Sequence, residues 1–358
     1  MTEGPVTHWR ATCGVAALLV ALTGCTTTGS SGHASSAPAV STPTTDTGSP
    51  TPPSSGAWGP LTPVPCPSPK RVRVPTPVAA VVAIDGCNLL VAAGSAVWVI
   101  SGGTSRQAWT IPSGYDTAAI AYAGGSLWWA GVGEAGTRLL SVNSAGGTTS
   151  EVALPDSTTE IVALHVWGDR IVVGMTGRHG HSVVAAVKGA RLEPLLERAG
   201  RITGLAADPT SIAAVFATPH QSTVVWGRPN ALHEHTWRGP ANIVDVAVNG
   251  QDIAFGLTRL DSEQIPQGSE VLLSSIQGRH WSDLHLGRAE LTAIAFVTSE
   301  LWLSKSGTSG GISVYAAAAD GSLRHVPAAG ASELPIFLLP TPDGTWVVGS
   351  DAFVLDTH

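Results

Sequence analysis

Charged residues are scarce in this 358-residue chain. Asp, Glu, Lys and Arg make up 13% of it, with 19 Lys and Arg against 26 Asp and Glu, so the net charge is −7. The lysines are only three: Lys70, Lys188 and Lys305. A nucleic-acid-binding protein presents a basic patch or stripe to the phosphate backbone. The composition therefore argues against a nucleic-acid partner.

The apolar run near the N-terminus is too short to cross a bilayer. Residues 11–22, "ATCGVAALLVAL", carry no charge over twelve positions, whereas a transmembrane helix needs about 20 apolar residues. A run of this length near the N-terminus is typical of a secretory signal peptide. We therefore predict a signal peptide over residues 1–24 and an extracytoplasmic protein.

The end of this segment, Leu22-Thr23-Gly24-Cys25, resembles a bacterial lipobox. The resemblance implies that Cys25 accepts a diacylglyceryl group and becomes the first residue of a mature chain anchored to the cell membrane. Two acyl chains hold a protein stably on a membrane, where one holds it only marginally. The abundance of Ala and Gly and the few lysines resemble an actinobacterial protein. An ordinary secretory signal with an incidental cysteine, or a membrane-anchored N-terminus, remains an alternative.

The cysteine count leaves one pair. With Cys13 in the signal peptide and Cys25 lipidated, Cys66 and Cys87 remain. An even number of cysteines in a secreted chain favours a disulfide, because the compartment is oxidising. We predict a disulfide between Cys66 and Cys87, with two buried free thiols as the alternative.

Residues 26–65 have the composition of a tether. Ser, Thr, Pro, Gly and Ala dominate this segment, and Asp46 is its one charged residue. Such a segment buries too little apolar surface to offset the entropy of ordering it. We therefore predict that residues 25–65 hold the lipidated Cys25 and a disordered linker, and that the folded domain spans residues 66–358.

The remainder of the chain repeats a unit of about forty residues. Each unit has an apolar strand, a turn and a second apolar strand, as in "AIAYAGGSLWWAG" from Ala119 and "AIAFVTSELWLS" from Ala293, followed by two further β-rich runs. The second strands align on Leu89, Leu127, Ile171, Ile212, Ile253, Leu301 and Trp346. Four short strands per repeat of this length is the pattern of a β-propeller blade.

The repeats predict an all-β fold, a seven-bladed β-propeller with four-stranded blades. Six or eight blades and a pair of β-sandwiches remain alternatives. The chain lacks the Gly-His and Trp-Asp signature of WD repeats, and "TPDGTW" at residues 341–346 resembles an Asp-box that has lost one residue. No propeller subfamily is therefore assigned.

The last repeat is one strand short. A ring of blades must close, because an open blade leaves an unpaired strand edge. We predict that a strand over about residues 70–77 pairs with the C-terminal strand "AFVLDT" and completes the last blade. This places Cys66 and Cys87 together at the seam of the ring.

Polar residues gather in the connections that should rim one mouth of the propeller. The candidate binding-face residues are Glu134, Arg138, Arg178, His179, His181, His220, Gln221, Arg259, Asp261, Glu263 and Lys305. Three of these histidines, His179, His181 and His220, could form an open metal site, but the pattern favours solvated loop side chains. We predict no metal, no cofactor and no catalytic residue.

The absence of catalytic motifs favours binding over chemistry. The three tyrosines lie outside any setting of clustered arginines and paired carboxylates, and no Gly-x-Ser-x-Gly nucleophile elbow occurs. We predict a non-catalytic, lipid-anchored platform at the cell surface for a protein, peptide or cell-envelope glycan. The alternative is a secreted hydrolase or lyase with a polar site on the loops of blades three to five.

Overall fold

The structure is a computed structural model. It describes Trp58 and residues 71–73, 77–85, 88–102, 104–238, 241–260, 266–278, 281–297, 299–306, 312–318, 321–326, 337–341, 344–348 and 351–355. Cys25, Cys66, Cys87, Asp261 and Glu263 lie outside the described residues, so the predicted lipidation and disulfide stay predictions. Within the described ranges, no helix has the length and apolarity that a membrane crossing requires.

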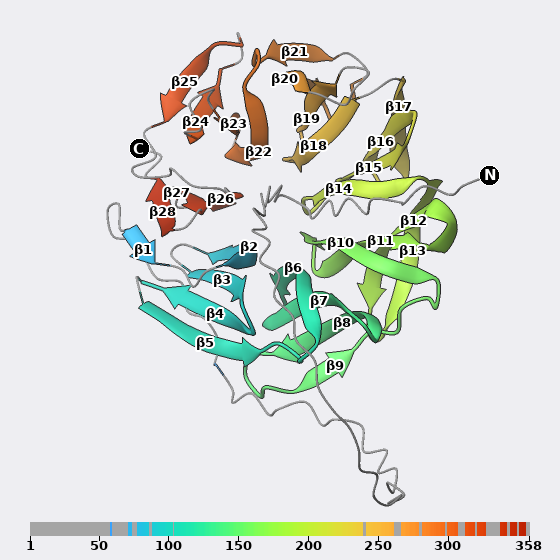
Figure 1. The fold of residues 1–358 in the computed structure, drawn as a ribbon, viewed down its shortest axis with the longest axis vertical. Coiled ribbons are helices and arrows are strands. Elements are labelled where there is room, and N and C mark those ends of the chain that lie inside the picture. Colours follow the sequence, from blue (N-terminus) through green and yellow to red (C-terminus); the bar gives the residue numbers. More distant parts are fainter. Residues whose placement is uncertain are drawn as a thin grey trace, which may run out of the picture.

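Twenty-eight strands form four-stranded antiparallel sheets arranged around a central axis (Figure 1). Blade one contains β2 (Val78–Asp85), β3 (Asn88–Ala93), β4 (Ala96–Ser101) and β5 (Thr104–Thr110). Blade two contains β6 (Tyr115–Ala123), β7 (Ser126–Gly133), β8 (Gly136–Asn143) and β9 (Thr149–Glu151). Blade three contains β10 (Thr158–Trp167), β11 (Arg170–Gly177), β12 (His181–Lys188) and β13 (Arg191–Ala199). A short 3₁₀ turn, η1 (Arg178–Gly180), joins β11 to β12.

Blades four to six follow the same order. Blade four contains β14 (Arg201–Ala207), β15 (Ile212–Thr218), β16 (Gln221–Arg228) and β17 (Ala231–Arg238). Blade five contains β18 (Ala241–Val248), β19 (Asp252–Leu260), β20 (Pro266–Ser275) and β21 (Ser282–His285). Blade six contains β22 (Glu290–Val297), β23 (Glu300–Ser306), β24 (Ile312–Ala317) and β25 (Leu323–Val326). The closing sheet has the order β1-β28-β27-β26, from β1 (Arg71–Arg73), β26 (Phe337–Thr341), β27 (Gly344–Val348) and β28 (Asp351–Leu355).

The predicted ring of seven blades needs a correction. Among the described strands, only six blades are made of four consecutive strands, so the repeat by itself builds six blades, not seven. The remaining sheet is a composite of both ends of the described chain, in which β1 pairs with β28. The described part of its N-terminal strand is Arg71–Arg73, within the predicted range of about 70–77.

The inner strands carry a β-bulge at the same place in six blades. The register shifts lie between Val78 and Ala80, Thr117 and Ala119, Ile161 and Ala163, Ile202 and Gly204, Ile243 and Asp245, and Leu291 and Ala293. The residue after the bulge is Ala or Gly in five of these blades and Asp245 in the other. A bulge bends its strand and increases the local twist, so each inner strand turns at the same height along the axis.

Neighbouring blades pack through glycines that face large apolar side chains. A β-carbon on Gly174 would lie 3.0 Å from Cδ1 of Ile202 in the next blade, and one on Gly256 would lie 2.2 Å from Cδ2 of Leu291. Ile202 and Leu291 are each 1% exposed. The large side chain of one blade therefore occupies the space that the missing side chain of its neighbour leaves open.

This packing makes a stability prediction. Gly256→Ala should lower the free energy of unfolding by about 1–3 kcal/mol, because overpacking forces buried neighbours to move. Leu291→Ala removes the atoms that the new methyl group meets, so the Gly256→Ala/Leu291→Ala double variant should be more stable than the sum of the single effects predicts. Urea unfolding of all four proteins measures this coupling.

A distant buried leucine provides the control. Leu127 lies in blade two, and Leu127→Ala should combine additively with Gly256→Ala. Additive behaviour of Gly256→Ala with Leu291→Ala as well would show that the two positions do not share this space.

Candidate functional site on the loop face

One end of the propeller carries the turns between the second and third strands of each blade and the connections from blade to blade. We call this end the loop face. Because successive strands of a blade are antiparallel, the end of β7, the start of β8 and the start of each inner strand all lie there. The inner strands contact one another in succession around the axis, and β26 contacts β2 (Figure 1). Their first residues therefore surround the mouth of the channel.

Two predicted arginines are held by carboxylates that the sequence analysis did not name. Arg138 binds Glu151 through two hydrogen bonds of 2.8 and 2.7 Å. The hydrogen bonds that Arg138 donates to Glu151 hold the pKa of Glu151 below its usual value and raise the pKa of Arg138. Arg259 reaches the two oxygens of Glu270 at 2.7 and 3.0 Å. These ion pairs therefore hold the guanidinium groups of both arginines in defined positions.

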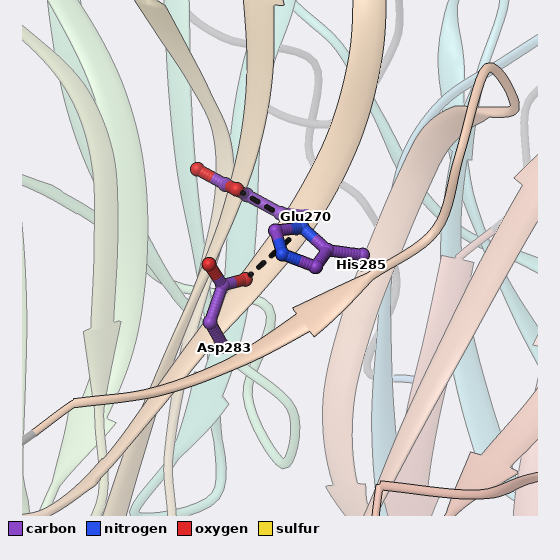
Figure 2. A group of neighbouring side chains, drawn as sticks. All are labelled: Glu270, Asp283 and His285. Carbon is purple, nitrogen blue, oxygen red and sulfur yellow. Dashed lines mark ion pairs between the residues drawn. The ribbon is translucent and has the colours of Figure 1, made fainter.

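Glu270 is also the centre of a cluster in blade five (Figure 2). Its side chain is 3% exposed, and Nδ1 of His285 lies 3.5 Å from its Oε2 and 3.6 Å from Oδ1 of Asp283. Among the described residues, these three form the one group with metal-ligand spacing. The guanidinium of Arg259 already neutralises the Glu270 carboxylate, however, and a metal ion would have to displace it. The arrangement is that of an ion-pair cluster.

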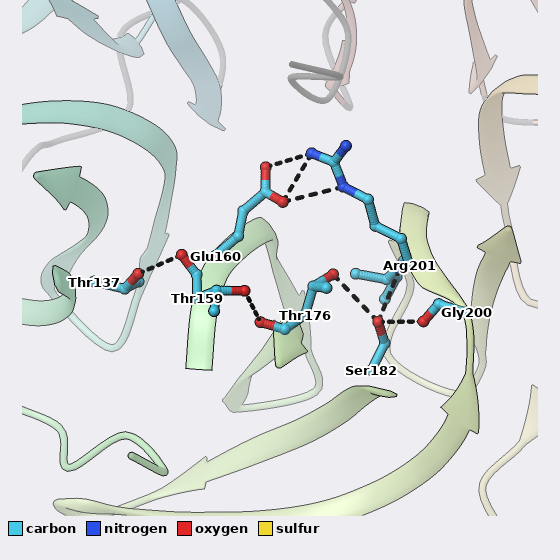
Figure 3. A network of polar contacts seen from close by, with 8 residues as sticks. Thr137, Thr159, Glu160, Thr176, Ser182, Gly200 and Arg201 are labelled. Atoms are coloured by element: carbon cyan, nitrogen blue, oxygen red, sulfur yellow. Dashed lines mark hydrogen bonds and ion pairs between the residues drawn. The ribbon is translucent and has the colours of Figure 1, made fainter. Parts of the chain in front are cut away.

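A bidentate ion pair joins blades three and four at the channel mouth (Figure 3). Nη2 of Arg201 lies 2.8 Å from each oxygen of Glu160, and Nε lies 3.1 Å from Oε2. Glu160 is the third residue of its inner strand and Arg201 is the first of the next. Bidentate Arg–carboxylate pairs restrict both distance and orientation, so this contact fixes the two blades at the mouth.

Glu160 and Arg201 occupy one repeat position, directly before the first residue of each bulge. The same position holds Asp116 in blade two, Asn242 in blade five and Glu290 in blade six. Asp116 and Glu290 are exposed. The position holds a polar residue in blades two to six and Pro77 in blade one, so the mouth carries an incomplete polar ring, which the sequence analysis missed. Comparing the residue that precedes the apolar stretch of each inner strand across the repeats would have revealed it.

Hydroxyl groups beneath this ring tie blades two, three and five to the blade that follows (Figure 3). Thr137 donates to the carbonyl of Thr159 at 3.0 Å, and Ser182, at the equivalent position of blade three, donates to the carbonyl of Gly200 at 2.8 Å. Ser182 is fully buried and also accepts the amide of Ile202 at 2.9 Å. In blade five, Ser269 accepts the amide of Leu291. A buried hydroxyl thus repeats the same contact between blades.

The three histidines considered for a metal site are exposed and lie in two separate turns. His179 lies in η1 with φ 69°, His181 begins β12, and His220 lies between β15 and β16. The group with metal-ligand spacing within the described part of the chain includes none of them. The turn of blade three, with Arg178, and that of blade four, with Gln221, expose side chains without bringing them together.

Two further predicted residues have local roles. Glu134 is exposed at the turn between β7 and β8. Lys305 places Nζ 4.6 Å from the centre of the Tyr315 ring, a cation–π distance. The candidate residues therefore share the loop face, but they form separate local contacts instead of one converging site.

Two titratable side chains on inner strands have strongly shifted pKa values. Burial lowers the pKa of His165 to about 4, against the effect of a hydrogen bond with the backbone of Leu205 in the next blade. Burial raises the pKa of Asp245 to about 6, although its carboxylate accepts the amides of Ile294 at 2.9 Å and Val246 at 2.8 Å. Ile294 also belongs to the next blade. Each group thus contacts the backbone of the following blade.

These shifts predict opposite dependences of stability on pH. Between pH 4 and 6 the folded state holds more protons on Asp245 than the unfolded state does, so this carboxyl makes stability fall as pH rises. His165 holds fewer protons when folded, so it makes stability rise between pH 4 and 6.5. Each contribution amounts to at most about 3 kcal/mol.

Asp245→Asn should therefore make the free energy of unfolding rise more steeply from pH 4 to 6 than in the unaltered protein. His165→Gln should make it rise less steeply than in the unaltered protein across the same range. Urea titrations at half-unit pH steps measure both differences. Curves for the two variants that run parallel to that of the unaltered protein would contradict the assignment.

Comparison with solved structures shows the fold. YCF48 from Cyanidioschyzon merolae aligns with a TM-score of 0.58 and 13% identity, over 80% of this chain and 98% of that one. YCF48 bound to D1 peptide aligns at 0.57 and 16%, over 82% and 98%. The Dos1 propeller aligns at 0.54 and 13%, over 78% and 79%. This chain is a β-propeller. No family model and no curated protein matches it.

Proposed function

We propose that this chain is a lipid-anchored, cell-surface propeller that binds a protein or peptide segment across its loop face. The observation that carries the proposal is the polar ring at the channel mouth, with Glu160 and Arg201 locked together across two blades. A ring of fixed charges on a rigid β scaffold presents hydrogen-bonding groups at low entropic cost to a ligand. One propeller of similar fold, YCF48, is known in complex with a peptide.

The position of Trp58 supports an outward-facing loop face. Its side chain is 4% exposed, packs 5.9 Å from the ring of Tyr122, and its carbonyl accepts a hydrogen bond from Arg106. Tyr122 is next to the last residue of β6, and Arg106 is near the start of β5, so both lie at the end opposite the loop face. A tether that joins the propeller at this end would direct the loop face away from the membrane.

The anchor makes its own prediction. Cys25→Ala should leave the propeller folded and move it from the membrane fraction to the soluble fraction, because no acyl chain could be attached. Fractionation combined with the intact mass of the membrane-bound protein measures both effects. If the mass of the membrane-bound wild-type protein shows an unmodified Cys25, the lipid anchor is contradicted. The proposed binding surface is independent of that result.

The binding surface is tested by exchanging charges. Displayed random twelve-residue peptides, selected on the full mature chain, should lose affinity by at least about tenfold on the Glu160→Arg/Arg201→Glu exchange, because the ion pair persists while its charges change places. Fluorescence anisotropy of the selected peptides measures the change.

A matched exchange lies at the opposite end of the propeller. Arg170 and Glu193 form an ion pair of 3.7 Å there, and Arg170→Glu/Glu193→Arg should leave peptide affinity within about twofold, since exposed pairs contribute little. Equal effects of the two exchanges would place the peptide elsewhere.

A further inference from the structure

The outermost strand of blade four, β17, has an open and regular edge. It is the terminal strand of its sheet, and its eight residues pair with β16 from Arg228↔Ala231 to Gln221↔Arg238 without a register shift. Its sequence, "ALHEHTWR", contains no proline, glycine or lysine. The backbone N–H and C=O groups of β17 that face away from β16 are therefore regularly spaced along its outer edge.

The other outermost strands carry the features that protect an edge from pairing. Such features are short length, proline and bulges. β1 and β9 have three residues, and β21 and β25 have four. β5 contains a bulge at Ala108, and β13 contains Pro194 beside another bulge. Among the outermost strands that the structure describes, β17 alone is both long and unbulged.

The two faces of β17 differ in chemistry. His233, His235 and Trp237 point toward blade five, where Trp281 lies 6.0 Å from the Trp237 ring, and Trp237 and Trp281 are partly exposed. The alternate residues point toward blade three, where Glu234 pairs with Arg198. Arg238, on this second face, is exposed and forms no ion pair with a described residue. Together with Arg198 of blade three, this second face carries two positive charges and one negative charge.

From this geometry we propose that β17 is a strand-addition site for an extended peptide that alternates aromatic or aliphatic residues with acidic ones. The peptide becomes a fifth strand of blade four through backbone hydrogen bonds. Its apolar side chains lie beside Trp237 and Trp281, and its carboxylates lie beside Arg198 and Arg238. The site is on the outer rim, separate from the loop face.

The test uses a fluorescein-labelled eight-residue peptide that alternates valine or tryptophan with glutamate. In a bound strand, every second amide donates to β17 and the others point away. Two versions with N-methyl groups on alternate amides, in opposite phases, should therefore behave differently. One phase should weaken binding by at least about tenfold and the other by less than about twofold.

Location is measured by hydrogen exchange and by charge. Amides of residues 231–238 should gain protection on peptide binding, while those of β13 should not. Arg238→Glu should weaken binding of this peptide, and Glu160→Arg/Arg201→Glu should leave it unchanged, which separates this site from the loop face. Thermal unfolding checks that each variant remains folded.

Three results would overturn the proposal. They are the absence of binding, an equal effect of the two N-methyl phases, and protection outside β17. Concentration-dependent dimerisation that protects β17 and excludes the peptide would assign the edge to a second copy of the chain instead.

Discussion

The lateral contact between neighbouring blades is the constraint on which this molecule depends. A single four-stranded blade exposes both of its faces, and neither is buried until the next blade packs against it. The fit is close: Gly174 and Gly256 leave room for Ile202 and Leu291 of the following blades, and no side chain larger than hydrogen fits there without movement. Above this apolar layer, Ser182 and Thr137 fasten adjacent blades through their hydroxyl groups. Stability and site geometry thus arise from the same interface.

The blade architecture was predictable because its signals are local. Short apolar strands separated by turns recur at nearly constant spacing, and each strand pairs mainly with its neighbours in sequence. The closure from both ends also followed from counting strands in the last repeat, since an unpaired edge needs a partner. Arg71–Arg73 is the described part of the closing strand and lies within the predicted range. The repeat yields six complete blades, and the composite sheet depends on residues far apart in the chain.

The site was predictable only in outline. The loop residues were placed on one face, but their partners were not found, since Glu151 and Glu270 come from other strands of the same blades and carry no motif. The pair of Glu160 and Arg201 lies 41 residues apart in sequence. Only a comparison of equivalent repeat positions could have joined them. Asp245 could also be found only by comparing repeats. It stands where five other blades have Ala or Gly, and its carboxylate accepts a hydrogen bond from the backbone of the next blade.

Trp58 has a mechanical consequence. It is buried against blades one and two and precedes β1, the three-residue strand that completes the composite sheet. A pull on the chain from its N-terminal side would reach the indole and the Arg106 hydrogen bond before it reached β1. Tension is then borne by a buried aromatic side chain inside the ring of blades, and the few hydrogen bonds between β1 and β28 are spared the load. Trp58 would thus protect the short pairing of β1 with β28 from tension on the chain.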